Sequence, residues 1–122
     1  MLQNEILWPK NGSTVQVLSD EPQQVEVFDP HKGYERPVLC IPVVIEQGCL
    51  RKKGLLSLNL LFSTEILGTN ANNETVKHHF SSEEQALKEL KGCTLKFYHG
   101  RSERGRYWRF FRIMQGIYTL SA

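Results

Sequence analysis

The chain has 122 residues, of which 40% are hydrophobic and 23% charged, and its formal net charge is +2. This length suits a single domain with one core, and the composition excludes a disordered or collagen-like chain. The longest apolar runs, 38–45 and 55–62, are shorter than the roughly 20 residues of a membrane helix, and residues 1–5 lack the basic start of a signal peptide. We therefore expect one soluble, cytoplasmic domain over residues 1–122 with no membrane partner.

The three cysteines, Cys40, Cys49 and Cys93, are an odd number at wide spacing. This is typical of reduced thiols in a cytosol, and none of the spacings fits a Cys-x-x-Cys zinc half-site. His78 and His79 are adjacent, which is not the spacing of metal ligands. The sequence predicts no metal ion and no other cofactor.

Hydrophobic alternation predicts three strands in the first half of the chain. Residues 13–18 alternate polar and apolar side chains, and the pattern resumes at 25–28 after a proline, which predicts a long, bent first strand. The β-branched run 38–45 predicts a second strand, and alternating leucines at 56–60 predict a third.

A helix and a hairpin are predicted in the second half. Ser81-Ser82-Glu83-Glu84 reads as a capping box, and Lys91-Gly92 supplies a basic last turn with a glycine stop. Two strand-like runs, 94–99 and 106–113, then flank a loop bounded by glycines, which indicates a hairpin.

The order of these elements is three strands, a helix and two strands. It is the order of the OB fold, a five-stranded Greek-key barrel with one helix between strands three and four. We expect this mainly β fold over residues 12–113, followed by a C-terminal tail at 114–122.

Positive charge is gathered toward the C-terminus. Residues 91–112 interleave seven basic side chains with six aromatic ones, whereas most charged residues among 1–30 are acidic. Phosphates require regularly spaced cations and unstacked bases require flat rings, each stacked base contributing about 1–3 kcal/mol. The pattern therefore predicts binding of single-stranded nucleic acid, DNA rather than RNA, without catalysis.

In an OB fold the loops joining strands one and two and strands four and five clamp the bound strand. We place the candidate nucleic-acid-binding residues in these loops, in the turn between strands two and three, and in the closing hairpin: Lys32, Tyr34, Arg36, Arg51, Lys52, Lys53, Lys96, Tyr98, Arg101, Arg104, Arg106, Tyr107, Trp108 and Arg109. Tyr98 faces outward if Phe97 shares the core with Leu95. The run 51–53 is equally compatible with a solvated hairpin tip.

The last predicted strand leaves two alternatives open. Tyr107 and Arg109 share one face of the strand, and Trp108 and Phe110 share the other. Alternation alone does not determine which face is exposed to solvent. We favour Trp108 in the core, because large rings dominate small cores, with Tyr107 and Arg109 binding. In the reverse orientation Trp108 stacks on a base.

The chain resembles OB-fold single-stranded-DNA-binding proteins, including phage, plasmid and archaeal versions, from Trp8 to Ile113. The resemblance lies in the glycine-led first strand Gly12-Ser13-Thr14-Val15-Gln16-Val17 with its proline break. It also lies in the late strand Lys91-Gly92-Cys93-Thr94-Leu95-Lys96, which is followed by the partner strand Arg106-Tyr107-Trp108-Arg109. It implies a role in the replication of a phage or mobile element.

The rival hypothesis is a protein-interaction module or inhibitor subunit of a phage or mobile element that uses the same basic surface. Pairing of an edge strand, either the last strand or residues 117–120, would give a homodimer. An enzyme is not expected, because His99 has no nucleophile and orienting carboxylate placed near it by the sequence, and the helix start explains Glu83 and Glu84.

Overall fold

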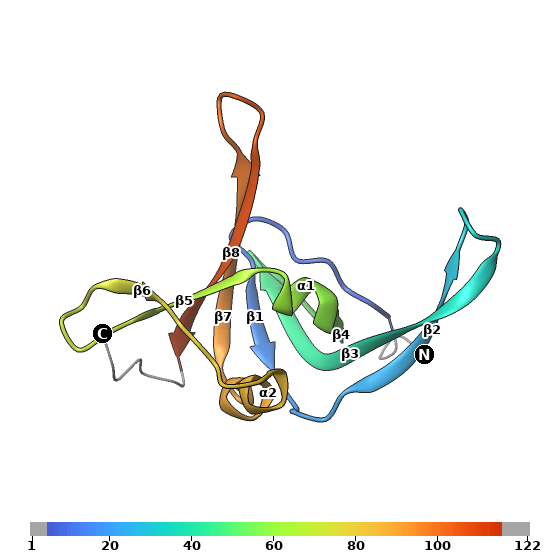
Figure 1. Ribbon diagram of the computed structural model, residues 1–122, viewed down its shortest axis with the longest axis horizontal. Helices are drawn as coiled ribbons and strands as arrows, with labels where there is room; N and C mark the ends of the chain where they lie inside the picture. The colour runs from blue at the N-terminus through green and yellow to red at the C-terminus, as the bar shows by residue number, and fades with distance from the viewer. Residues whose placement is uncertain (1–4, 116–122) are drawn as a thin grey trace.

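The computed structural model describes residues 5–115 of the protein. Within them the fold is mainly β, as predicted, with eight strands and two short helices (Figure 1). The strands are β1 Thr14–Val17, β2 Gln23–Asp29, β3 Tyr34–Gln47, β4 Leu50–Ser57, β5 Glu65–Thr69, β6 Thr75–Lys77, β7 Thr94–Arg101 and β8 Tyr107–Gln115. The helices are α1 Leu58–Phe62 and α2 Glu83–Leu90. All the strands belong to one sheet of order β2-β3-β1-β7-β8-β5-β6, with β4 paired to β3.

The first predicted strand is long and bent, and it consists of two pieces. β1 and β2 both run antiparallel to β3, with Val17 opposite Val43 and Gln23 opposite Cys40. The chain between them contains Pro22, which has no N–H to donate to a ladder. β2 then continues with the first half of β3 as a hairpin that leaves the body of the sheet (Figure 1).

Pro42 lies inside β3 without ending it. It stands opposite Leu55 of β4, at the position where the other neighbour of β3 changes from β1 to β2. The ladder on that side is already interrupted there, so the missing N–H of proline costs little pairing. The Pro42 carbonyl accepts a hydrogen bond from the N–H of Leu18 at 3.0 Å.

Arg51, Lys52 and Lys53 lie within β4, so the prediction that they form a turn between strands two and three is wrong. The β3–β4 ladder extends out to Gln47, and the turn itself contains Gly48 with a φ of 59°. Glycine adopts this positive φ without strain, which allows a shorter turn than the segment's composition indicates.

The sheet is not closed into a barrel within residues 5–115. After β4 the chain enters α1, and β5 then pairs parallel with β8, with Ile66 opposite Phe111. In this part of the chain no ladder joins β4 to β8. The edge of β4 is covered instead by the N-terminal segment, whose Leu7 N–H donates to the Leu55 carbonyl at 2.7 Å and whose Glu5 carbonyl accepts from the Leu55 N–H at 2.9 Å. Residues 5–115 thus contain eight strands and two helices, where the sequence predicts five strands and one helix.

β8 is an interior strand of the sheet, with β7 on one side and β5 on the other. β5 pairs with Phe110, Phe111 and Arg112 only, so the middle of β8 is covered on both sides. The homodimer expected through the last strand stays a prediction. The alternative segment, residues 117–120, lies outside the described residues.

The core of the described residues lies between the sheet and the two helices. Its largest fully buried side chains include Ile41, Leu95 and Phe111, and Phe97 is also buried, as predicted. α2 covers one end of this core with three buried residues, Ala86, Leu87 and Leu90. The predicted helix is confirmed, although the residue that caps it is Ser82, whose Oγ accepts from the N–H of Gln85 at 3.0 Å. None of the helices in the described chain is long and apolar enough to cross a membrane.

Candidate nucleic-acid interface

The β7–β8 hairpin projects from the body of the sheet and presents two faces (Figure 1). Phe97 and Phe111 stand opposite each other and are both buried, which fixes the inner face. Because side chains alternate along a strand, Tyr98 and its partner Phe110 lie on the outer face. The inner face continues toward the tip with His99, Arg101, Tyr107 and Arg109, and the outer face includes Lys96, Gly100, Trp108 and Arg112.

Trp108 is 44% exposed, so the prediction that it packs in the core is wrong and the reverse orientation of β8 holds. Phe111 takes the core position, with an exposed fraction of 0%. The side chains of β8 alternate as predicted, and the contact of β8 with β5 and β7 at Phe111 decides which set of side chains is buried.

Three rings form an aromatic ladder on the outer face, defined here as Tyr98, Phe110 and Trp108. The centroids of Trp108 and Phe110 are 6.0 Å apart with 22° between the ring planes, and those of Phe110 and Tyr98 are 5.1 Å apart with 30°. At the foot of the ladder the Lys96 Nζ lies 5.6 Å from the centre of the Tyr98 ring. The ladder thus combines stacked, partly exposed rings with a cation.

The inner face of the hairpin also pairs rings with cations. His99 and Tyr107 have ring centroids 5.8 Å apart, and the guanidinium carbon of Arg101 lies 5.9 Å from the Tyr107 ring centre. Arg109 donates from Nη2 to the Oγ of Ser63, just after α1, at 2.7 Å. Tyr107 is 50% exposed, so it is available to a ligand on this side.

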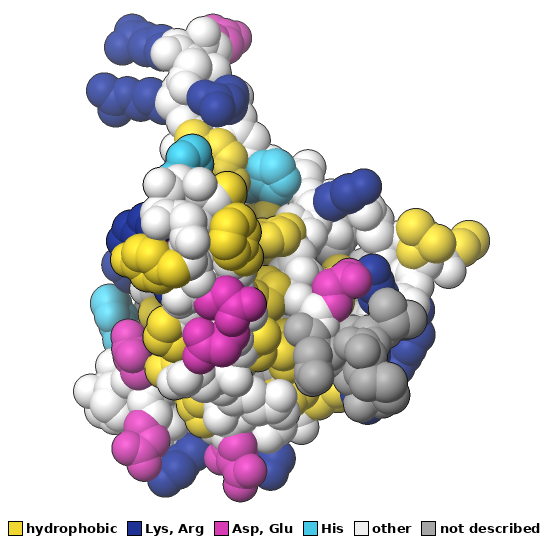
Figure 2. All heavy atoms as spheres, turned by 90° about the vertical axis from the view of Figure 1, so that its right-hand side faces the viewer, with side chains coloured by type: hydrophobic (Ala, Val, Ile, Leu, Met, Phe, Trp, Pro, Cys, Tyr) yellow, Lys and Arg dark blue, Asp and Glu magenta, His cyan; other side chains and the backbone are white. Residues whose placement is uncertain are grey.

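The tip of the hairpin carries Arg101, Arg104 and Arg106, all exposed. A compact turn holds it, in which Ser102 Oγ accepts from the N–H of Arg106 at 3.1 Å and Gly105 has a φ of 81°. Figure 2 shows basic side chains gathered at this end of the molecule, with acidic side chains over the middle and lower part of the same face. None of the three arginines has a carboxylate partner among residues 5–115.

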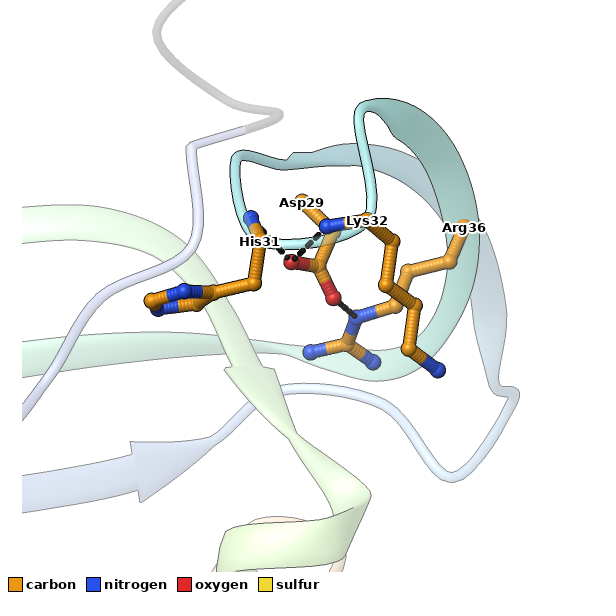
Figure 3. Close-up of polar contacts among 4 residues, drawn as sticks. All are labelled: Asp29, His31, Lys32 and Arg36. Atoms are coloured by element: carbon orange, nitrogen blue, oxygen red, sulfur yellow. Dashed lines mark hydrogen bonds and ion pairs between the residues drawn. The ribbon is translucent and has the colours of Figure 1, made fainter.

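The β2–β3 hairpin carries the second set of predicted residues, Lys32, Tyr34 and Arg36. Asp29 organises its turn, because Oδ1 accepts from the N–H groups of His31 at 2.9 Å and Lys32 at 3.3 Å, while Oδ2 lies 3.5 Å from Nε of Arg36 (Figure 3). The Lys32 side chain points away from this carboxylate (Figure 3). Tyr34 is 56% exposed. Lys32 and Tyr34 are therefore open to a ligand, whereas the charge of Arg36 is partly balanced.

The cations of β4 are largely neutralised. Arg51 pairs with Glu46 at 2.8 Å and Lys52 with Glu5 at 2.5 Å, and only Lys53 of this run has no carboxylate partner in the described chain. The structure therefore shifts the unbalanced positive charge to the β7–β8 hairpin.

A pocket of about 670 Å³ lies at the base of the β2–β3 hairpin, against α1. Its lining includes Trp8, Arg36, Leu39, Phe62 and Ser63. Because Ser63 is also the partner of Arg109, the pocket is linked to the inner face of the β7–β8 hairpin. The pocket lining includes no residue of β7 or β8, and the two hairpins diverge, so the structure does not bring the two predicted loops together around one groove (Figure 1).

Three residues of the basic and aromatic surface were not among the predicted binders: Phe110, Arg112 and Lys77. Phe110 and Arg112 share the parity of Trp108, so the alternation of β8 could have identified them once its orientation was known. Lys77 belongs to β6, which pairs with β5 through Leu67 opposite Lys77, and no sequence signal marked this short strand.

The described residues contain no group of three or more His, Cys, Asp or Glu side chains that could hold a metal ion. Comparison of the chain with models of protein families, with curated proteins and with solved structures found no match. The function is therefore argued from the geometry of the surface.

Proposed function

We propose that this protein binds single-stranded nucleic acid, DNA in preference to RNA, and catalyses no reaction. One observation carries the proposal: the β7–β8 hairpin combines exposed rings on both faces with arginines that have no carboxylate partner in the described chain. Arginines of this kind attract phosphates, and rings of this kind stack on unpaired bases of any sequence.

We also infer that the fold is of OB type with a partly open barrel. β1 with β2, β3, β4, β7 and β8 supply the five strands, and their order in the sheet, β4-β3-β1-β7-β8, supports this assignment. In this reading β5, β6 and α1 form an insertion between strands three and four. The β2–β3 and β7–β8 hairpins then correspond to the two loops that clamp nucleic acid in OB folds.

Fluorescence anisotropy with labelled oligo-thymidine, the matching oligo-uridine and a duplex of equal length tests the proposal. We expect binding to single strands at low salt, weaker binding to the duplex, and an affinity that falls as salt rises. A variant with Arg101, Arg104 and Arg106 all changed to Ser should lose at least tenfold in affinity for oligo-thymidine. Absence of single-strand binding at low salt, or a preference for duplex, would overturn the proposal.

Lys88→Ser is the control for this experiment, since its ammonium group is paired with Glu84 on α2, away from the predicted binding residues. Its affinity for oligo-thymidine should stay within about twofold of the wild type. Loss of binding to an acidic protein partner in the tip variant, with oligonucleotide binding unchanged from the wild type, would instead support the protein-interaction module and contradict our proposal.

A further inference from the structure

The ladder registers align four strands so that their outward side chains form one row. Lys96 of β7 stands opposite Arg112 of β8, Arg112 opposite Leu67 of β5, and Leu67 opposite Lys77 of β6. Directly opposed residues in a sheet project from the same face. Three cations that are distant in the sequence therefore lie in a single line across the outer face, which we call the cation row.

The length of the cation row suits contact with several phosphates of an extended single strand. Neighbouring strands are about 4.8 Å apart, so the three steps from β7 to β6 span roughly 14 Å. The row runs across the strands, and Lys77 is exposed while Lys96 and Arg112 are half-buried. None of the three cations is paired with a carboxylate in the described part of the chain.

The aromatic ladder begins one row nearer the hairpin tip. Tyr98 and Phe110 are two residues along their strands from Lys96 and Arg112, which places their Cα atoms roughly 7 Å from those of the cations on the same face. The Lys96 Nζ itself lies 5.6 Å from the centre of the Tyr98 ring. Glu65 continues the ring row on β5, opposite Phe110. An acidic side chain at this position repels phosphate, so a bound backbone is favoured on the cation row and its bases on the rings.

On the other side of Lys96 the row continues through Thr14 to Glu46 and Arg51. The ion pair between Glu46 and Arg51 removes the net positive charge at that end. The unbalanced stretch therefore begins at β7 and ends at β6.

We propose that the outer face of β7, β8, β5 and β6 is a second contact surface for the single strand, with phosphates on the cation row and bases on the aromatic ladder. This inference rests on the proposed function and specifies where the strand runs after it leaves the hairpin tip. It differs from contacts at the tips of the two hairpins, because the cation row lies on the face of the sheet opposite to the core.

The test compares two double variants with equal loss of charge. Lys77→Ser with Arg112→Ser removes two cations of the row, and Lys88→Ser with Lys91→Ser removes two cations of the α2 region that are paired with Glu84 and Asp20. We expect the first variant to bind a long oligo-thymidine at least tenfold more weakly than the second. Its logarithmic salt slope should fall by about 1.4, as expected when two contacts to a single strand are lost.

Glu65→Lys is the reciprocal variant, since it adds a cation beside Phe110. It should bind oligo-thymidine several-fold more tightly than the wild type, and a gain in affinity cannot result from misfolding. Ultraviolet crosslinking to oligo-thymidine should label peptides that contain Tyr98, Phe110 or Trp108.

The outcomes separate the two proposals. If the hairpin-tip variant loses binding but the Lys77 and Arg112 variant matches its control and Glu65→Lys has no effect, the second surface is wrong while the proposed function stands. If the wild type binds no single strand at low salt, the proposed function itself fails. If the variant with Lys77→Ser and Arg112→Ser keeps its oligonucleotide affinity but no longer binds a protein ligand, this face binds a protein. That result would also overturn the inference.

Discussion

The indole ring of Trp108 lies against the backbone of Gly100, its partner across the β7–β8 ladder. A Cβ atom on Gly100 would come within 2.7 Å of Cζ2 of Trp108, so the ring occupies the space that any other residue would fill. Contact with the glycine covers part of the ring while 44% of the residue stays exposed. Gly100 therefore positions an exposed stacking platform.

Gly100→Ala should displace the Trp108 ring and weaken oligo-thymidine binding by about fivefold or more, since one stacked base contributes about 1–3 kcal/mol. Tryptophan quenching by the oligonucleotide, measured in a Trp8→Phe background, should decrease in parallel. In a Trp108→Ala background the same glycine substitution should add nothing, because its effect acts through the ring. An equal loss of oligo-thymidine affinity in the wild-type and Trp108→Ala backgrounds would show that Gly100 does not act through the Trp108 ring.

The arginines of the hairpin tip should determine the salt dependence of binding. Replacing Arg101, Arg104 and Arg106 by Ser removes three cations without carboxylate partners in residues 5–115, so the logarithmic salt slope should become shallower by about 2. Titrations at several salt concentrations measure this slope. Lys88→Ser should leave the slope nearly unchanged. A slope that shifts equally in both variants would argue against localised contacts at the tip.

Local patterns predicted those elements whose signals are local. The alternation around Val15 and Val17, with a proline after it, gave the bent first strand because one side of that strand packs on the core. The serine and glycine signals gave α2, and the glycine-bounded loop gave the β7–β8 hairpin.

The remaining features depend on contacts between distant segments. The segment Leu58–Phe62 alternates leucine and asparagine at its start, which predicts a strand, yet Leu60 and Leu61 are both buried by a single helical turn. Short apolar runs do not distinguish the two structures. The exposure of Trp108 similarly depends on the position at which β5 pairs with β8. The charge of Lys52 is balanced by Glu5, which is distant from it in the sequence. Neither partner is visible in the local pattern.

Gly54→Ala should destabilise the protein. A Cβ at this position would lie 2.7 Å from the Leu7 side chain and 2.8 Å from the Glu5 carbonyl oxygen, so the N-terminal segment would have to move off the edge of β4. Overpacking of this kind costs typically about 1–3 kcal/mol, and urea denaturation should show it as a lower midpoint. Cys49→Ala, at an exposed turn position nearby, should change the free energy of unfolding by no more than about 0.5 kcal/mol. An unchanged midpoint for the glycine variant would show that the N-terminal segment does not pack on Gly54.

The cysteines should differ sharply in reactivity. Cys49 is exposed, whereas Cys40 and Cys93 are buried, so a thiol-specific reagent should modify Cys49 rapidly in the native protein and the other two only after unfolding. Counting modified thiols by mass spectrometry over time measures this. A Cys49→Ala variant that still reacts rapidly would place a second thiol at the surface.

Burial also raises the pKa of the Cys40 thiol above its ordinary value of 9.0, which links this residue to alkaline stability. Below that value the thiol is protonated in both the folded and the unfolded chain, so it contributes no pH dependence. Above it the unfolded chain loses the proton while the folded chain retains it, and the free energy of unfolding therefore falls as pH rises. Cys40→Ala should make this alkaline fall shallower than in the wild type, as followed by urea denaturation between pH 8 and about 10.5, and Cys49→Ala serves as the control with an exposed thiol. If the two variants and the wild type lose stability with the same slope, the Cys40 thiol is not protected from ionisation in the folded protein.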